Sequence, residues 1–361
     1  MFKERIYNFS AGPSMLPVEA MERAAAEILN FNGSGMSVME MSHRSKVYDD
    51  IFQSVKEKLR AVMSIPENYH ILFMHGGATG QFAAVPMNLM GEGGADYAIT
   101  GNFSKGAADE AKKFGKVNVI YDTACQNHNY IPAQNELKFT PGASYFHYCF
   151  NNTIYGTAWK YIPKTDGMPV ITDMSSNILS EPLDVSKLDM IYAGAQKNMG
   201  PAGFTVVIIK DGLAGKAMGC TPKILDYSLM IKNDSMLNTP ATYNIYMLGL
   251  VLDWLKGLGG LEAIGKINKE KSQILYDYLD NSKFYTAHAK PEARSMMNVT
   301  FRSLNEELDA KFAKESAAAG FTNLKGHRSV GGMRASIYNA MPVEGVKKLV
   351  EFMSEFERNN K

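Results

Sequence analysis

A lysine and an aspartate are the residues of this chain whose types and positions first suggest a chemical function. Lys197 lies within a segment of small residues, 191–203, and Asp173 closes the apolar run 170–172. A lysine amine can condense with an aldehyde, and a carboxylate can keep a heterocyclic nitrogen protonated. These are the two groups that pyridoxal phosphate requires of a protein. A lone lysine after a strand is more simply a surface residue, so the hypothesis depends on the small-residue frame and on Asp173.

A glycine-rich loop at 75–81 follows an apolar run and precedes a helix-like stretch. Small residues let backbone N–H groups approach a phosphate, and a helix N-terminus favours its negative charge. The loop lacks the lysine and Ser/Thr of a Walker loop, and it does not match GxGxxG. Taken alone it is a tight strand-to-helix turn. Together with Asp173 and Lys197 it favours an anion site.

Two further residues follow strand-like runs and have side chains suited to a flat ring. Phe103 could stack on such a ring, although most phenylalanines belong to the core. Thr153 could offer a hydroxyl, although its surroundings also suit an ordinary Asn-rich turn. Neither residue is a specific signal by itself.

Histidine and arginine pairs form a third group of candidates. An arginine inside the apolar pattern 333–337 is costly unless it meets an anion, and guanidinium groups bind carboxylate and phosphate oxygens bidentately. Structural ion pairs are the simpler explanation for any one of them, but several together suggest a substrate with more than one negative group. No histidine shows metal-ligand spacing, so no metal is expected. The candidates are His43, Arg44, His327, Arg328 and Arg334.

Composition bounds the class of protein. A chain of 361 residues is long enough for two domains, and 45% hydrophobic with 21% charged residues is typical of a globular protein. A net charge of +1 argues against nucleic-acid binding. The apolar stretch 245–252 is too short for a membrane span. Three scattered cysteines and the absence of a signal-peptide pattern indicate the cytoplasm.

Alternating short strands and helices predict the fold. Helix periodicity is clear over 47–63, and a first helix is expected from Pro17 to residue 30. Helix-like stretches separate several of the strand-like runs. This order predicts an α/β fold with a mostly parallel, seven-stranded sheet and ligands at the carboxyl ends of its strands. The strand-like runs are 70–74, 97–99, 117–121, 144–149, 170–172, 190–192 and 204–209.

The pattern of helix and strand signals in the sequence changes after residue 209. An amphipathic region over 244–279 is interrupted at 257–260, and helix and strand patterns then continue to residue 358. We expect an N-terminal segment, 1–15, near the small domain, a large domain over 16–259, and a small C-terminal α/β domain over 260–361.

The residues resemble those of a known family along essentially the whole chain. The chain is similar to the phosphoserine aminotransferases, which are class V aminotransferases with the type I fold of pyridoxal-phosphate enzymes. The matching segments are 8–13, 38–44, 75–77, 80–86, 192–198, 200–203, 238–240 and 325–342. The segment 325–342 is the most specific of them.

The resemblance implies a role for each matching residue. Lys197 corresponds to the Schiff-base lysine and Asp173 to the partner of the pyridine nitrogen. Cofactor contacts are implied for Ala78, Thr79, Phe103, Thr153 and Gln196, and from the other subunit of a homodimer for Asn238 and Thr239. Substrate contacts are implied for Arg334 at the α-carboxylate, and for His43, Arg44, His327 and Arg328 at the distal anion, some of them also across the dimer.

Two positions depart from some members of that family. Thr79 stands where some have arginine, which weakens the case for one distal-anion contact. Phe103 stands where some have tryptophan, which keeps a stacking face of smaller area.

The implied reaction is ping-pong transamination between L-glutamate and 3-phosphohydroxypyruvate, giving O-phospho-L-serine and 2-oxoglutarate in serine biosynthesis. The related formation of 4-phosphohydroxythreonine in pyridoxine biosynthesis stays open. One alternative is a cysteine desulfurase-like lyase, for which Cys125 is the cysteine in a turn-rich context. Another is a non-catalytic module that binds phosphate ligands through the glycine loop.

Overall fold

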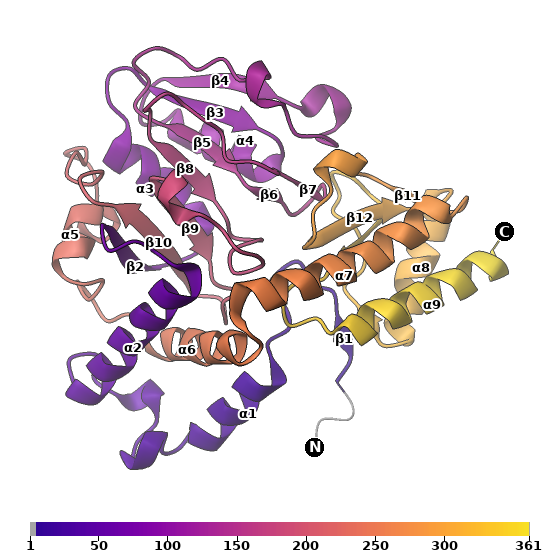
Figure 1. Ribbon diagram of the computed structural model, residues 1–361, viewed down its shortest axis with the longest axis horizontal. Helices are drawn as coiled ribbons and strands as arrows, with labels where there is room; N and C mark the ends of the chain where they lie inside the picture. Colours follow the sequence, from indigo (N-terminus) through magenta and orange to yellow (C-terminus); the bar gives the residue numbers. More distant parts are fainter. Residues whose placement is uncertain (1–4, 361) are drawn as a thin grey trace.

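Seven strands form the central sheet of the molecule (Figure 1). The computed structural model describes residues 5–360. All seven strand-like runs of the sequence are present in this sheet, so the predicted seven-stranded α/β fold is confirmed. The strands, in spatial order, are β2 (Tyr69–His75), β10 (Phe204–Lys210), β9 (Met190–Gly194), β8 (Val170–Asp173), β5 (Phe146–Cys149), β3 (Ala95–Ile99) and β4 (Val117–Asp122).

The sheet is parallel except at one strand. β10 runs antiparallel to both β2 and β9, whereas β9, β8, β5, β3 and β4 pair in parallel. Asp173 pairs in register with Cys149 on one side and with Tyr192 on the other. The carboxyl ends of β5, β8 and β9 therefore meet at one edge, which is where ligands bind in sheets of this kind.

Helices cover both faces of this sheet, so its strands are apolar on both sides. Along β2, Ile71 and Phe73 join one core cluster, whereas Leu72 and Met74 join another on the opposite face. The first cluster includes α2 (Lys46–Met63) and α6 (Thr242–Gly257); the second includes α3 (Ala78–Leu89), α4 (Asn102–Ala111) and α5 (Tyr227–Lys232).

Local signals explain where several helices begin. Ser45 caps α2 by accepting a hydrogen bond from the Tyr48 N–H, as expected for an N-cap serine. The first helix, α1 (Val18–Glu27), begins after Pro17 and ends three residues earlier than residue 30. α3 and α4 each begin three residues before the helix-like stretches 81–89 and 105–114 of the sequence, because small and polar residues outnumber apolar ones in their first turns.

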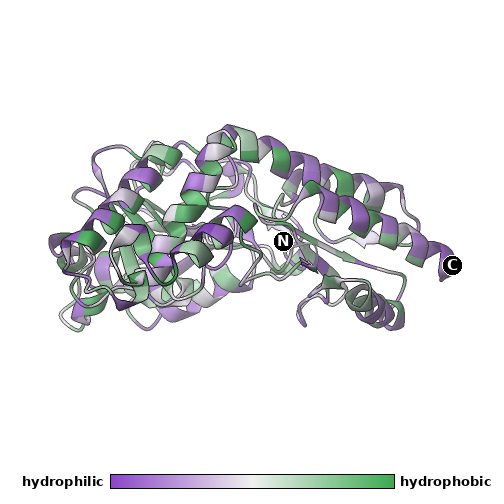
Figure 2. Ribbon diagram, turned by 90° about the horizontal axis from the view of Figure 1, so that it is seen from below, coloured by the Kyte–Doolittle hydropathy of each residue, from purple (hydrophilic) through white to green (hydrophobic). Residues whose placement is uncertain are grey.

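A second, smaller layer is built by the C-terminal residues around its own core cluster. α7 (Gly260–Asn281) and α9 (Val343–Asn359) pack together against a three-stranded sheet (Figure 1). Hydrophobic and hydrophilic residues alternate along the long helices near the C-terminus in Figure 2, as expected for helices that bury one face. The remaining elements are β11 (Thr286–Ala287), β12 (Asn298–Arg302), β14 (Met333–Ser336) and α8 (Glu306–Ala318).

Two further pairings involve strands of only two residues each. β1 (Tyr7–Asn8) lies parallel to β13 (Phe321–Thr322), so the N-terminal segment packs on the C-terminal layer. β6 (Asn151–Asn152) and β7 (Thr157–Ala158) form a small antiparallel pair directly after β5. Among residues 5–360, no helix has the length and apolar character needed to cross a membrane. The predicted domain boundary at residues 259 and 260 falls between α6 and α7 and stays a prediction.

Candidate active site

The candidate residues surround a cavity of about 270 Å³ at the carboxyl edge of the central sheet, which we call the Lys197 cavity. Asp173 is the last residue of β8, and Lys197 follows the end of β9. The lining comprises Ala11, Gly12, Gly77, Ala78, Thr79, Phe82, Phe103, Cys149, Asn151, Thr153, Ile154, Asp173, Ser175, Ser176, Gln196, Lys197, His327 and Arg334.

Lys197 is held at the centre of this cavity by a hydroxyl and faces an aromatic ring. Its side chain is buried, and its Nζ donates a hydrogen bond to Thr153 Oγ1 across 3.0 Å. The same Nζ lies 5.6 Å from the centre of the Phe103 ring. Burial lowers the pKa of Lys197, and Arg334 adds to this, although the charge of Asp173 opposes the shift. A lysine with a lowered pKa is a better nucleophile and base near neutral pH.

Asp173 is buried and fixed by its neighbour. Oδ1 accepts hydrogen bonds from Ser175 N at 2.8 Å and from Ser175 Oγ at 2.6 Å. Desolvation raises the pKa of Asp173, while the Ser175 hydroxyl and the charge of Lys197 lower it. Ser175 Oγ also accepts a hydrogen bond from Gly194 N, which ties the ends of β8 and β9 together. Neither Ser175 nor its role was predicted, because the sequence gives no sign of which serine turns back onto the carboxylate.

The opposite wall is the N-terminus of α3. Gly77 precedes this helix, and Ala78 and Thr79 are its first two residues, whose N–H groups have no partner within the helix. A Cβ built on Gly77 would meet nothing within 4 Å, so the backbone is open toward the cavity side. Gln196 lines the same cavity. Free amides at a helix N-terminus favour an anion, and the anion site expected at the glycine loop stays a prediction.

Cations reach the Lys197 cavity from the C-terminal layer. Arg334 lies on β14, and its Nε is buried without a hydrogen-bond partner among the described residues. Burial lowers the pKa of Arg334, and burial together with Arg334 and Arg328 lowers the pKa of His327. An unpaired guanidinium beside a neutral histidine is suited to receive an anion.

The N-terminal segment forms a wall that the residue types did not indicate. Ala11 and Gly12 line the cavity, and Tyr338 donates a hydrogen bond to the Ala11 carbonyl across 2.9 Å. Gly12 has φ +135°, and a Cβ there would lie 3.3 Å from Lys197 Cγ. Ser14 donates its hydroxyl to the Lys197 carbonyl. Only the match at residues 8–13 pointed to this segment, and it named no contact.

Five residues that the sequence suggested do not line this cavity. Asn238 and Thr239 are exposed in the loop before α6, where the Thr239 carbonyl meets His75 Nε2 at 2.8 Å. Arg44 and Arg328 are exposed. His43 is half-buried, and its Nε2 lacks a partner among the described residues.

The residues around the Lys197 cavity fit the cofactor expected from the sequence. A buried amine, a buried carboxylate and a helix N-terminus match an aldehyde, a ring nitrogen and a phosphate respectively. Phe103 and Thr153 lie near the amine.

Comparisons with known proteins agree with this geometry. Residues 6–349 match the family model of class-V aminotransferases. The chain is 50% identical over 359 residues to a phosphoserine aminotransferase from Bacillus cereus, covering 99% of this chain and 100% of that protein. The structure resembles phosphoserine aminotransferase from Bacillus circulans subsp. alkalophilus, with a TM-score of 0.98, 44% identity, and coverage of 99% and 100%. It also resembles a phosphoserine aminotransferase from Trichomonas vaginalis with bound pyridoxal phosphate, with a TM-score of 0.93, 41% identity, and coverage of 97% and 100%.

Proposed function

The chain belongs to the class V aminotransferase family, and we propose that it transfers the amino group of L-glutamate to 3-phosphohydroxypyruvate. The products are O-phospho-L-serine and 2-oxoglutarate, and the reaction serves serine biosynthesis. It is an aminotransferase that depends on pyridoxal 5′-phosphate. The observation that carries the proposal is the meeting of Lys197, Asp173 and Arg334 in one cavity.

Bound pyridoxal phosphate supplies an aldehyde that carries the amino group between substrates and a ring that accepts electron density from the substrate Cα. Lys197 removes the proton from Cα, because its Nζ lies in the cavity and burial favours the neutral amine. Thr153 orients that Nζ through its hydroxyl. Asp173, oriented by Ser175, holds the proton on the ring nitrogen.

The cationic side of the cavity determines substrate orientation in this proposal. Arg334 binds the α-carboxylate, because its guanidinium lines the cavity and its Nε has no partner among the described residues. His327 meets the distal anion from the adjacent loop. The N-terminal wall at Ala11 and Gly12 limits access of water to Lys197.

The active site is completed in a homodimer. Asn238 and Thr239 reach the cofactor phosphate of the other subunit, and the distal substrate anion meets further cations. This proposal rests on the family resemblance and on the absence of these residues from the lining of the cavity in their own chain. The residues concerned are His43, Arg44 and Arg328, of which the two arginines are exposed.

A desulfurase reaction is not favoured by the cysteines. Cys125 is exposed and does not line the Lys197 cavity. Cys149 does line it, but burial raises the pKa of its thiol well above the ordinary value, which disfavours a thiolate nucleophile.

The three free cysteines also suit the reducing cytoplasm that we propose as the location.

A coupled assay tests the substrate. With L-glutamate as donor, we expect 3-phosphohydroxypyruvate to be converted far better than 3-hydroxypyruvate, which lacks the phosphate. Equal kcat/KM for the two acceptors would contradict the proposal. The phosphorylated 2-oxo acid that leads to 4-phosphohydroxythreonine, measured in the same assay, tests the pyridoxine reaction.

A further inference from the structure

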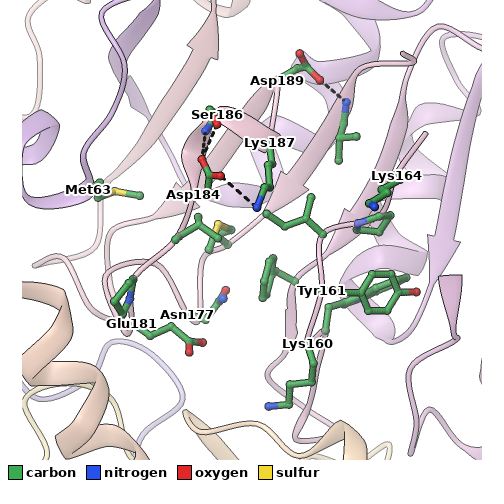
Figure 3. Close-up of a pocket in the computed structure, with 18 of the residues that line it drawn as sticks. Met63, Lys160, Tyr161, Lys164, Asn177, Glu181, Asp184, Ser186, Lys187 and Asp189 are labelled. Carbon is green, nitrogen blue, oxygen red and sulfur yellow. Dashed lines mark hydrogen bonds and ion pairs between the residues drawn. The ribbon is translucent and has the colours of Figure 1, made fainter. Parts of the chain in front are cut away.

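A second cavity lies outside the Lys197 cavity, and we call it the outer cavity. Its volume is about 860 Å³, which is within the range of small-molecule sites. It lies between the loop from β7 to β8 and the segment from β8 to β9, and the ends of α2 and α7 reach it through Met63 and Leu261. Figure 3 shows its lining side chains.

The two cavities share their wall. Cys149 and Asn151 line the Lys197 cavity, whereas Phe150 between them lines the outer cavity. The same alternation occurs after β8, where Met174 lines the outer cavity and its neighbours Asp173 and Ser175 line the other. The outer cavity is therefore built into the same strand ends as the active site.

The inner part of the outer cavity is apolar but holds two unpaired polar atoms. Its lining side chains include Phe150, Trp159 and Leu183. Trp159 is 1% exposed and Asn177 is 8% exposed, yet Trp159 Nε1 and Asn177 Oδ1 have no hydrogen-bond partner among the described residues. A buried donor and a buried acceptor without partners are costly, and a bound polar group would satisfy them.

Charged residues lie around the outer cavity, and most of them neutralise one another. Lys187 pairs with Asp184 at 3.2 Å, and Lys210 pairs with Asp189 at 3.1 Å. Asp184, Lys187 and Asp189 lie toward the upper end of the view in Figure 3.

Lys160, Glu181 and Lys164 also line the cavity, and none of the three takes part in an ion pair within 4 Å among residues 5–360. Lys160 and Glu181 lie toward the lower end of Figure 3, with Asn177. Lys160 Nζ donates one hydrogen bond, to the Arg294 carbonyl at 2.6 Å, and keeps two protons free. Desolvation lowers the pKa of Lys160 and raises the pKa of Glu181, although both retain exposed surface, and the charge of each opposes the shift of the other.

We propose that the outer cavity binds a small zwitterionic molecule with an apolar body, such as an aromatic α-amino acid. Its carboxylate meets Lys160 and its ammonium group meets Glu181. The apolar body lies against Phe150, Trp159 and Leu183, and the cation Lys160 with the anion Glu181 matches the two opposite charges of the zwitterion. This site does not depend on the proposed reaction.

Calorimetry on the cofactor-loaded enzyme tests the proposal with three indole compounds. L-tryptophan carries both charges, indole-3-propionate only the carboxylate, and tryptamine only the ammonium group. We expect L-tryptophan to bind about tenfold more tightly than either analogue, because only L-tryptophan can make both charge-assisted hydrogen bonds.

Two variants assign the charges. Lys160→Met weakens L-tryptophan and indole-3-propionate about tenfold but leaves tryptamine unchanged, and Glu181→Gln weakens L-tryptophan and tryptamine but leaves indole-3-propionate unchanged. Lys164→Met is the matched control, since Lys164 is a second exposed lysine at the same cavity to which the proposal assigns no contact with the bound molecule, and binding should stay as in the parent enzyme. Retained transamination shows that each variant is folded.

Two further variants locate the bound molecule. Leu183→Trp fills the outer cavity and should abolish binding, whereas Arg334→Ala alters only the Lys197 cavity and should preserve it. Absence of L-tryptophan binding to the parent enzyme overturns the proposal. Binding that is lost in Arg334→Ala but unchanged in Lys160→Met and Glu181→Gln also overturns it, because the molecule then occupies the active site.

Discussion

Ser175 donates its hydroxyl to Asp173 Oδ1 across 2.6 Å while the same Oγ accepts the Gly194 N–H at 3.0 Å. One serine thereby fixes the carboxylate at the end of β8 relative to the end of β9, two residues before Gln196 and three before Lys197. The distance between acid and lysine is thus determined by neighbouring strands and one hydroxyl, rather than by a flexible loop.

Removing that hydroxyl should change the pH profile of the enzyme. Ser175 lowers the pKa of Asp173, so Ser175→Ala raises this pKa and moves the acidic limb of kcat against pH to higher pH. We expect a loss of about tenfold in kcat at neutral pH. Asp173→Asn should lose on the order of 10²–10³-fold at every pH. An unchanged acidic limb in Ser175→Ala would show that the serine does not act through Asp173.

Arg334 should contribute mainly to substrate binding. Arg334→Ala removes the charge-assisted hydrogen bonds to the substrate α-carboxylate, and KM for both L-glutamate and the 2-oxo acid should rise about 10–100-fold. Arg334→Lys should recover part of the loss, because the charge remains but the bidentate geometry does not. Steady-state kinetics measure both effects. A fall in kcat without any rise in KM would place Arg334 in another role.

Lys271 is a buried cation that supports the C-terminal layer. It is 0% exposed on α7, and its Nζ donates to the carbonyls of Ile337, Tyr338 and Met341 at 2.8–3.0 Å. Lys271→Met removes the ammonium donor from all three carbonyls, of which Tyr338 keeps the Met341 N–H as a donor, so the free energy of unfolding should fall by about 3 kcal/mol.

Urea unfolding of the Lys271 variant gives this value. The matched control is Lys266→Met on the same helix, where the lysine is exposed and the change should stay within about 0.5 kcal/mol. Equal effects of the two substitutions would contradict a structural role for the buried ammonium group.

His147 should make stability depend on pH. It is buried on β5 with its Nε2 2.9 Å from the Tyr192 hydroxyl, and burial lowers its pKa from 6.5 to about 3. Above pH 6.5 the histidine is neutral in both states. As pH falls from 6.5 toward 3, only the unfolded state takes up the proton, and stability falls by about 1.4 kcal/mol per pH unit.

Urea unfolding between pH 7 and pH 5 measures this slope. The variant His147→Gln lacks the titrating group, so its stability should depend less on pH than that of the parent protein. The same slope in both proteins would mean that His147 is not the source of the pH dependence of stability.

The main elements of the fold could be predicted because their signals are local. Seven apolar runs predicted the seven strands of the central sheet, and the helical spacing of residues 47–63 predicted α2. The two-residue strands β1, β6, β7, β11 and β13 have no such periodicity, since each is too short to show one and is defined by its pairing partner.

The candidate site could be predicted less completely. Lys197 and Asp173 could be placed because the ends of apolar strands are visible in sequence, whereas the glycine loop located the start of α3 only to within three residues. The contacts of Gly12 and Ser175 could not, because they depend on how a distant segment and a turn fold back. The family resemblance, rather than spacing, supplied the remaining roles.

Identifying the lysine that binds the cofactor covalently tests most directly whether Lys197 is the catalytic lysine. Reduction of the cofactor-loaded enzyme with borohydride, followed by peptide mapping, should place pyridoxal phosphate on the peptide that contains Lys197, and the Lys197→Ala variant should give no labelled peptide and no turnover. Labelling at another lysine of the parent enzyme, or normal turnover by Lys197→Ala, would contradict the account.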